Sequence, residues 1–461
     1  MKKFLYLFAI LLIASPVLTA QTRYTVTELK TELSIIRAAL KESHAGAYRY
    51  TDSLTLEKEF AVLESKLTAP LTGHEFYKLV NPVLALIRDG HTKFHISGKP
   101  DDLFGFSKSG YFPLALYWIG SKAFVRANPY HIPAGAELTA INAKPVGQIK
   151  TQIFSNMLVD GYEESMKYAY INENFPGYYG AFVGTFSSFE ITFRFKGKTT
   201  KKTIRGTQAA SFSKSSVQKR PYVVDYTVPG TAIIKISAFQ PGHAGLGFED
   251  FLEKTFQTIT KAKIAKIILD LRDNEGGIDA YGIKLYARLT DKPFSYYDRF
   301  TVAGPPDYSF SKYATIPTEL QYLRPFIKKV GKEYHFMQKD GLGEQSPAKL
   351  NFTGTLVILT NGRSFSVTSE FASIARDNNR AIFIGEPTGG AAEGNTSGTF
   401  IFLHLPYTKL DLAIPVLGYH MKLSHLKSTG KGVMPDHLII PSITDVLHGR
   451  DRALEKALSI R

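Results

Sequence analysis

Short apolar runs alternate with amphipathic stretches through the second half of the chain. The runs are rich in Ile, Leu and Val, which is typical of buried strands, and they lie at 231–239, 264–271, 355–360 and 381–386. Between them, apolar side chains recur at helical spacing over 248–262, 280–290 and 367–378. Strands that alternate with helices predict an α/β core with a parallel-rich sheet, which we place at 218–461. We expect the aromatic, charged insertion at 291–349 to cover one end of the sheet.

Two regions with different patterns precede this core. Residues 24–98 repeat apolar positions at helical spacing and predict an N-terminal helical module. Residues 106–205 form short alternating runs that predict strands, with a helix that begins near Val146. Within this second region, the aromatic-rich part from Tyr162 to Phe186 has no clear period, and we interpret it as an insertion or lid.

The first twenty residues have the pattern of a secretory signal peptide. Lys2 and Lys3 precede an apolar run from Phe4 to Val17, and the small residue Ala20 stands before Gln21. The alternative is an uncleaved membrane anchor, but the run is short for a membrane span, so we predict cleavage near Ala20. No later segment is apolar for long enough to cross a membrane. The expected product is a soluble exported protein, periplasmic or extracellular, of a bacterial envelope.

Composition narrows the possible chemistry. The chain has 461 residues and a formal net charge of +15, but its basic residues are dispersed and no nucleic-acid-binding motif is present. We therefore expect no nucleic-acid partner. Cysteine is absent altogether, which excludes a disulfide framework, a cysteine nucleophile and thiolate metal sites.

Three separated segments carry candidate chemistry. Ser366 stands between the apolar run 355–360 and the helical pattern that follows, at a junction where free backbone N–H groups can hold an oxyanion. Taken alone, Ser366 is more simply an N-cap. The paired glycines Gly276 and Gly277 follow another buried strand and can present backbone N–H groups. His91 follows the helical module and could act as a base near neutral pH.

Four ordered motifs resemble those of the S41 peptidase family, which includes the C-terminal processing proteases and tricorn-like peptidases. The motifs are DLRDNEGG at 270–277, NGRSFSVTSEFA at 361–372, GEPTGG at 385–390 and GVMPD at 432–436. The resemblance implies an S41-like (ClpP/crotonase-like) core and places the nucleophile on Ser366. It also implies an oxyanion hole from the backbone N–H groups of Gly276 and Val367. Residues 132–153 resemble part of a PDZ domain, so the region 106–205 is predicted to be a PDZ-like module.

The resemblance also bears on the base. One branch of the family uses a lysine just beyond the G-E-P-T turn, where this chain has Ala391. The other uses a histidine from a D-x-H segment, which is present here as Asp89-Gly90-His91. We therefore assign the chain to the histidine-type branch, with His91 as the base.

The third member of the catalytic group is missing from the sequence pattern. The histidine branch has a glutamate shortly before G-V-x-P-D, and the matching residue here is Thr429, which cannot stabilise an imidazolium as a carboxylate does. Glu370, Glu386 and Glu393 are possible substitutes. Asp377 matches an acidic position in the family's helix and is interpreted as structural.

These features predict an exported serine-type endopeptidase that cleaves peptides or protein tails. The alternative is a catalytically inactive S41-like protein that binds peptides in the cell envelope. A metal site is a competing role for His91, because His95 follows at H-x-x-x-H spacing, but H-E-x-x-H is not present and no further ligands are indicated. We expect no metal and no organic cofactor.

Overall fold

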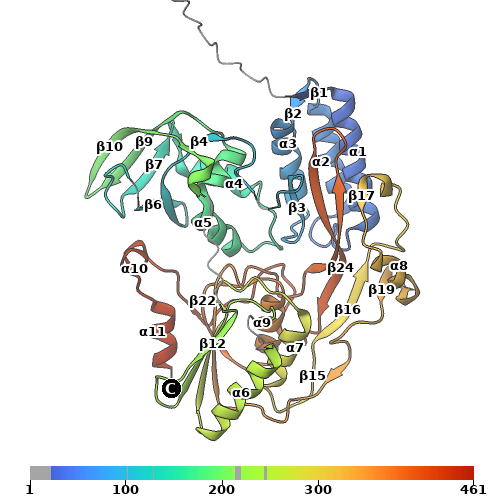
Figure 1. Cartoon of the computed structure of the whole chain (residues 1–461), viewed down its shortest axis with the longest axis vertical. Coiled ribbons are helices and arrows are strands. Elements are labelled where there is room, and N and C mark those ends of the chain that lie inside the picture. Colours follow the sequence, from blue (N-terminus) through green and yellow to red (C-terminus); the bar gives the residue numbers. More distant parts are fainter. Residues whose placement is uncertain (1–21, 101, 128, 213–219, 243–246, 461) are drawn as a thin grey trace, which may run out of the picture.

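The computed structural model describes residues 22–100, 102–127, 129–212, 220–242 and 247–460. The predicted signal peptide, 1–20, lies outside these residues. Figure 1 shows an N-terminal group of helices and a β-rich module side by side above a large mixed α/β body. The mixed α/β class is confirmed. Within the described residues, no helix is both long and apolar enough to cross a membrane.

Three helices make up the N-terminal group: α1 (Val26–Ser43), α2 (Ser53–Lys66) and α3 (Gly73–Ala85). Capping boxes begin α1 at Thr25 and α3 at Thr72, so both helix starts are fixed by local hydrogen bonds. A short pair, β1 (Arg23–Tyr24) and β2 (Leu71–Thr72), joins the two ends of the group. The chain then enters β3 (Lys93–Ile96), which pairs antiparallel with β24 of the body. The loop that carries His91 is therefore held between the helices and a body strand.

The β-rich module is an antiparallel sheet in the order β10-β9-β7-β6-β5, with β8 paired to β7. Its strands are β5 (Ala115–Ile119), β6 (Lys122–Ala127), β7 (Glu137–Ile141), β8 (Lys144–Pro145), β9 (Ser188–Phe195) and β10 (Lys198–Arg205). The sheet packs on α4 (Val146–Phe154) and α5 (Ser165–Phe182), while β4 (Ser109–Tyr111) pairs with β11 (Thr207–Gln208) beside it. The strand–turn–helix order of 132–153 is as expected, and its assignment to the PDZ class stays a prediction.

The interpretation of Tyr162–Phe186 as an insertion or lid is wrong. Most of this segment is α5, whose side chains lie in the core of the β-rich module. The helix is kinked at Asn174, which has non-helical angles, and Pro176 follows two residues later. The kink shifts the buried face part-way along the helix, so the sequence shows no single period.

The central sheet of the body has the order β12-β13-β14-β21-β22-β25, and all its neighbours are parallel except β12 and β13. The strands are β12 (Tyr222–Asp225), β13 (Thr231–Ile236), β14 (Lys266–Asp270), β21 (Thr355–Thr360), β22 (Ile382–Gly385) and β25 (His437–Leu438). One face packs on α6 (Phe248–Lys261), α7 (Asp279–Ala287) and α9 (Val367–Asp377). The other packs on α11 (Arg452–Ser459), after the short α10 (Ile443–His448). The parallel-rich sheet is thus as predicted.

A second, antiparallel sheet was not foreseen. Its order is β17-β23-β24-β16-β19-β18, with β3 on β24, and it is formed by β16 (Tyr297–Val302), β17 (Ala314–Thr315), β18 (Ile327–Val330), β19 (Glu333–Phe336), β23 (Thr396–His404) and β24 (Leu410–Met421). The expected cover at 291–349 instead supplies four of these strands, together with α8 (Glu319–Leu323), β15 (Phe294–Ser295) and β20 (Glu344–Gln345). Nearly every residue of β24 is buried, so no alternation of polar and apolar residues announces it.

Candidate active site

Ser366 stands at the sharp turn between β21 and α9. Its backbone has φ 55° and ψ −129°, a conformation that residues other than glycine rarely adopt. The turn is held by Ser364, whose hydroxyl donates to the Leu271 carbonyl (2.9 Å) and accepts from the Asn361 amide (3.1 Å). Ser366 occupies the N-cap position but makes no side-chain cap hydrogen bond. The simple N-cap role is therefore absent, and the Ser366 hydroxyl is left for another partner.

That partner is His91. The Nε2 atom of His91 lies 3.1 Å from Ser366 Oγ, although the two residues are 275 positions apart. The backbone around His91 is fixed by Asp89, whose Oδ1 accepts from the amides of His91 (2.7 Å) and Thr92 (2.9 Å). The imidazole also stacks on Phe365, with ring centroids 4.5 Å apart. The structure thus brings the two predicted catalytic residues into hydrogen-bonding distance.

Gly276 lies close to Ser366 and to the start of α9. It has φ 97°, and a Cβ atom built on it would be 2.7 Å from Ser366 Cβ and 3.0 Å from the Val367 amide nitrogen. Val367 opens α9, so its N–H is among the first amides, which have no acceptor within the helix. The Gly276 N–H, however, donates to the buried side chain of Asn274 (2.9 Å). Sequence reasoning missed this Asn274 contact.

The proposed third members do not lie at His91. Glu370 accepts from Tyr297 (2.6 Å) and Asn395 (2.8 Å). Thr429 is exposed, and among the described residues it makes no hydrogen bond to His91. The loop before the G-V-x-P-D motif is held by another contact, because the Gly430 amide donates to Glu393 Oε1 (2.8 Å).

Glu386 and Glu393 are also directed to other partners. The charges of Asp273 and Arg272, at the carboxyl end of the central sheet, act on the pKa of Glu386, whereas His91 does not. Glu393 Oε1 accepts from Tyr50 (3.0 Å). None of the four candidates from the sequence is therefore in place to orient the imidazole.

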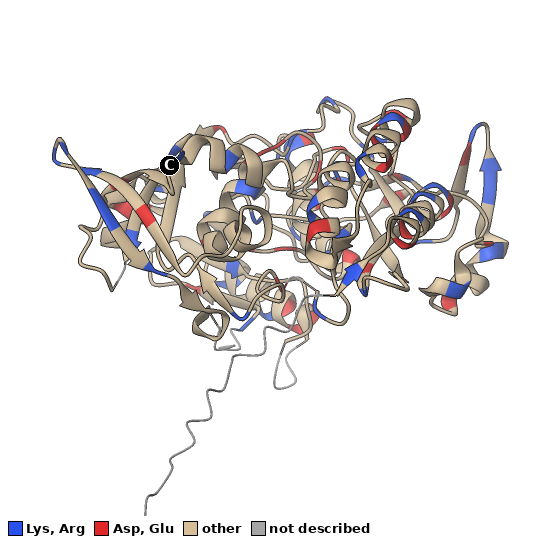
Figure 2. Ribbon diagram, turned by 90° about the horizontal axis from the view of Figure 1, so that it is seen from above, with Lys and Arg blue, Asp and Glu red and all other residues tan. Residues whose placement is uncertain are grey.

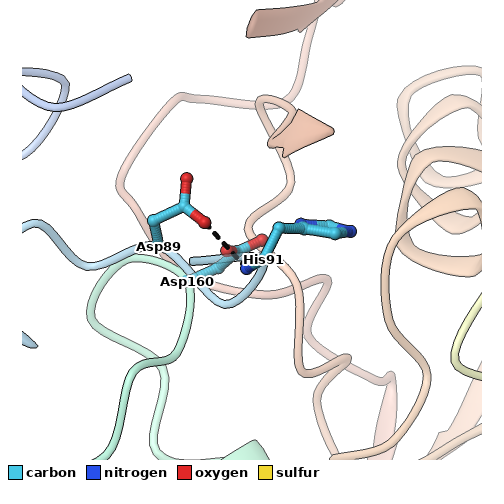
Figure 3. A group of neighbouring side chains, drawn as sticks. All are labelled: Asp89, His91 and Asp160. Atoms are coloured by element: carbon cyan, nitrogen blue, oxygen red, sulfur yellow. Dashed lines mark hydrogen bonds between the residues drawn. The ribbon is translucent and has the colours of Figure 1, made fainter. Parts of the chain in front are cut away.

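Two other carboxylates lie close to His91 (Figure 3). A ring nitrogen of His91 and one carboxylate oxygen each of Asp89 and Asp160 lie within 4.8 Å of one another. Asp89 belongs to the same turn as His91, whereas Asp160 comes from the loop between α4 and α5. Asp89 stood inside the quoted D-x-H motif without a role of its own, and no pattern in the sequence distinguishes Asp160.

Residues 230–439 match the model of peptidase family S41. This part of the chain, which carries Gly276 and Ser366, belongs to this family. Its members are serine peptidases, so the chain is a serine-type hydrolase, and its substrates are peptides or proteins. A comparison with curated proteins finds no match.

Solved structures resemble this S41 peptidase over nearly its whole length. The crystal structure of mature CPAF covers 94% of this chain and 96% of its own, with 14% identity and a TM-score of 0.66. A complex of CPAF with lactacystin covers 94% and 97%, with 15% identity and a TM-score of 0.65. The photosystem II D1 C-terminal processing protease covers 90% and 93%, with 15% identity and a TM-score of 0.41. At these identities the likeness to CPAF concerns the fold.

Burial sets the protonation of the site in this S41 peptidase. It lowers the pKa of His91 to about 4, although the charge of Asp89 acts to raise it. Burial raises the pKa of Asp160 to about 8, and the Asp89 charge acts in the same direction. Burial also acts to raise the pKa of Asp89, but the imidazoles of His44 and His91 and the hydrogen bonds from Thr396 and Thr92 together hold that pKa below its usual value. At neutral pH, Asp89 is therefore ionised, Asp160 protonated and His91 neutral.

A cavity of about 290 Å³ lies near the segment that follows His91 and the turn that precedes Gly276. Lys93, two residues after His91, and Glu275, directly before Gly276, are part of its wall. Aromatic side chains from the helical group and the β-rich module line much of the rest, namely Tyr77, Phe106, Tyr170, Tyr178 and Phe182. The cavity has the size and character of a site for a substrate side chain.

The donor atoms around His91 do not form a convincing metal site. Asp89, His91 and Asp160 could offer three ligand atoms, but both oxygens of Asp89 already accept hydrogen bonds and His91 Nε2 faces Ser366. His95 is not part of this group, and its Nδ1 instead faces the Ile96 carbonyl (2.9 Å). We assign no metal or cofactor to the site.

Proposed function

We propose that the protein is an exported endopeptidase in which Ser366 is the nucleophile and His91 the general base. The observation that carries the proposal is the 3.1 Å separation of His91 Nε2 and Ser366 Oγ. The strained backbone of Ser366 supports it, because strain of this kind collects at functional residues. Ala391, where the lysine branch has its base, is buried and offers no alternative.

The reaction follows from this arrangement. Ser366 Oγ attacks the scissile carbonyl carbon while its proton passes to His91 Nε2. The carbonyl oxygen becomes an oxyanion that the Val367 N–H can hold, and the Gly276 N–H joins it once that amide turns away from Asn274. His91 then gives the proton to the leaving amine. A water molecule, deprotonated by His91, attacks the acyl group in the same way and releases it from Ser366.

Substrate binding is proposed for two places. The aromatic cavity near the segment that follows His91 would take a side chain next to the scissile bond. The PDZ-like module would hold a peptide C-terminus by strand addition, for which its sheet offers the edge strands β5 and β10. The diffusely positive charge of the whole chain suits acidic peptides. In the view of Figure 2, Lys and Arg are spread over the whole molecule and interspersed with acidic residues.

A fluorophosphonate probe, which labels activated serines, tests the catalytic assignment. We expect the wild-type protein to be labelled, Ser366→Ala to give no signal, and His91→Ala to react about 10²- to 10⁴-fold more slowly. Ser373→Ala is the matched control, because Ser373 is a buried serine of the same helix whose hydroxyl donates only within α9, to the Ser369 carbonyl (2.7 Å). Wild-type labelling that persists in Ser366→Ala would refute the assignment.

The inactive peptide-binding alternative makes the opposite prediction. It requires no Ser366-dependent labelling at any pH, and nothing in the geometry of the pair favours it. Export is tested separately, by sequencing the N-terminus of the protein recovered from the cell envelope. We expect the mature chain to begin near Gln21, and a chain that keeps Lys2 and Lys3 would contradict the signal peptide.

A further inference from the structure

Two buried polar atoms near the catalytic pair have no hydrogen-bond partner among the described residues: Nδ1 of His91 and Oδ2 of Asp160. Unpaired buried polar atoms are uncommon in proteins and destabilise the folded state. Because Nε2 of His91 faces Ser366, Nδ1 is the ring nitrogen that remains for a positioning group. A ring nitrogen of His91 and a carboxylate oxygen of Asp160 lie within 4.8 Å of each other, a distance that one bridging water can span.

Asp89 is closer in sequence but is already occupied. Its Oδ1 accepts from two backbone amides, of His91 and Thr92. Its Oδ2 accepts from the Thr396 hydroxyl and lies 3.5 Å from His44 Nε2. Asp89 therefore fixes the backbone of the turn and supplies charge, while the orientation of the imidazole is left to another group.

Asp160 is held firmly enough to serve that purpose. The amide of Gly90, the residue before His91, donates to Asp160 Oδ1 (2.7 Å). The next residue, Gly161, donates its amide to the Arg88 carbonyl (2.9 Å), and it packs so closely on Gly430 that a Cβ would overlap that backbone. Asp160 is only 2% exposed. Its position relative to the His91 turn is thus set from both sides of the turn.

We propose that Asp160 is the positioning residue of the base, with its Oδ2 accepting a hydrogen bond from the Nδ1–H of His91 directly or through one water. It would replace the glutamate that the sequence lacks at Thr429. This inference rests on the proposed function of Ser366 and His91.

The proposal makes the active form depend on the proton of Asp160. When Asp160 is protonated, its Oδ2–H donates to Nδ1, and the neutral ring then carries its hydrogen on Nε2 and cannot accept the Ser366 proton. When the Asp160–His91 pair loses one proton, the hydrogen on Asp160 Oδ2 passes to His91 Nδ1 and the hydrogen on Nε2 is released to solvent. His91 Nε2 can then accept the Ser366 proton. The ionised carboxylate then also stabilises the imidazolium that forms during attack.

Several other charged or titratable groups face this pair and shape its titration. The charges of Asp89, Lys93 and Asp279 act on the pKa of His91. The charges of Asp89 and Arg49 act on the pKa of Asp160, and the buried Tyr50 hydroxyl lies near Asp160. Of these, Asp89 keeps its charge through the neutral range, because its pKa is held below the usual value. The group that loses a proton between neutral and mildly basic pH is therefore the Asp160–His91 pair.

The test is the rate of fluorophosphonate labelling of the purified protein from pH 5 to pH 10, corrected with Ser366→Ala. For the wild type, we expect the rate to rise with a midpoint near 8, the pKa to which burial raises Asp160, and not near 4 as for His91 alone. Asp160→Asn should react about 10²- to 10⁴-fold more slowly above this midpoint, because the amide can hold the ring in the wrong tautomer. The rising limb near pH 8 should also disappear.

Glu393→Gln is the matched control, since Glu393 is a neighbouring carboxylate whose Oε2 is also buried and unpaired but whose Oε1 bonds to Tyr50 and Gly430. It should keep the wild-type rate and midpoint. The proposal is overturned if the wild-type rate is flat from pH 6 to 9, a result that does not depend on whether any variant folds. The proposal is also overturned if folded Asp160→Asn keeps both the wild-type labelling rate and the rise of that rate near pH 8. A wild type without Ser366-dependent labelling overturns the proposed function itself, and the role of Asp160 with it.

Discussion

The backbone of Ser366 gives a stability prediction that is independent of substrate. With φ 55° and ψ −129°, this residue is held where a Cβ atom is strained, by about 1–3 kcal/mol for such conformations. Ser366→Ala keeps Cβ and Ser366→Gly removes it. Both substitutions remove the hydroxyl and its contact with His91, and neither loses a helix cap, since Ser366 makes none. Their difference therefore reports the strain at Cβ.

The magnitude follows by comparison with Ser373, which is buried in the interior of the same helix. There glycine should be less stable than alanine by about 1 kcal/mol, as it is in ordinary helix interiors. At Ser366 the same penalty is set against strain relief of about 2 kcal/mol, the middle of the range for such conformations. Ser366→Gly should then be more stable than Ser366→Ala by about 1 kcal/mol. The sign of the Ala-to-Gly change should thus reverse between the two positions.

Equilibrium unfolding in urea, followed by circular dichroism, measures the four variants under identical conditions. Comparing pairs cancels the loss of each hydroxyl and the greater freedom of glycine in the unfolded chain. The reasoning is refuted if glycine is less stable than alanine at position 366 by as much as at position 373. That result would mean that the turn relaxes when the nucleophile is removed and stores no strain.

Three further predictions concern the surroundings of the pair. Gly276→Ala would bring a Cβ within 2.7 Å of Ser366 Cβ at φ 97°. It should lower the labelling rate about 10²-fold or more, as the loss of an oxyanion donor does. The control Gly343→Ala, at a glycine with open space around it, should leave the rate unchanged. Asp377→Asn should lower the free energy of unfolding by about 2–3 kcal/mol and leave the labelling rate unchanged, because its two oxygens accept three backbone amides from 424–426; a lost labelling rate at full stability would contradict its structural role. Because the folded pKa of Asp160 is raised from 3.8 to about 8, the folded state keeps a proton that the unfolded chain has lost between these values, so the free energy of unfolding falls as pH rises through this window. Asp160→Asn should therefore gain stability relative to the wild type from pH 5 to 8 in urea titrations, and an unchanged difference would show that Asp160 is ionised throughout.

The parallel core could be predicted because local pattern and tertiary role coincide there. Strands β14 and β21 are buried on both faces, so their apolar runs stand out, and the turns that follow them carry the glycines and serine of the site. The antiparallel sheet gave no comparable signal. Its longest strand, β24, pairs with β23, which directly precedes it, but also with β16 and with β3 of the N-terminal group, which come from distant parts of the chain. Pairing of that kind is set by tertiary contacts, which a local pattern does not contain.

The same distinction explains why Ser366 and His91 could be predicted and their support could not. A nucleophile needs a special turn, and a turn leaves local signs in the residues around it. A positioning group needs only a carboxylate at the right point in space, which any segment can deliver. Here the segment is the loop before α5, whose helix was hidden by its kink at Asn174, so the loop had no apparent boundary in the sequence. Asp160 lies beside the His91 turn because the Gly90 amide donates to Asp160 Oδ1 and the Gly161 amide donates to the Arg88 carbonyl, and these long-range contacts exist only in the folded chain.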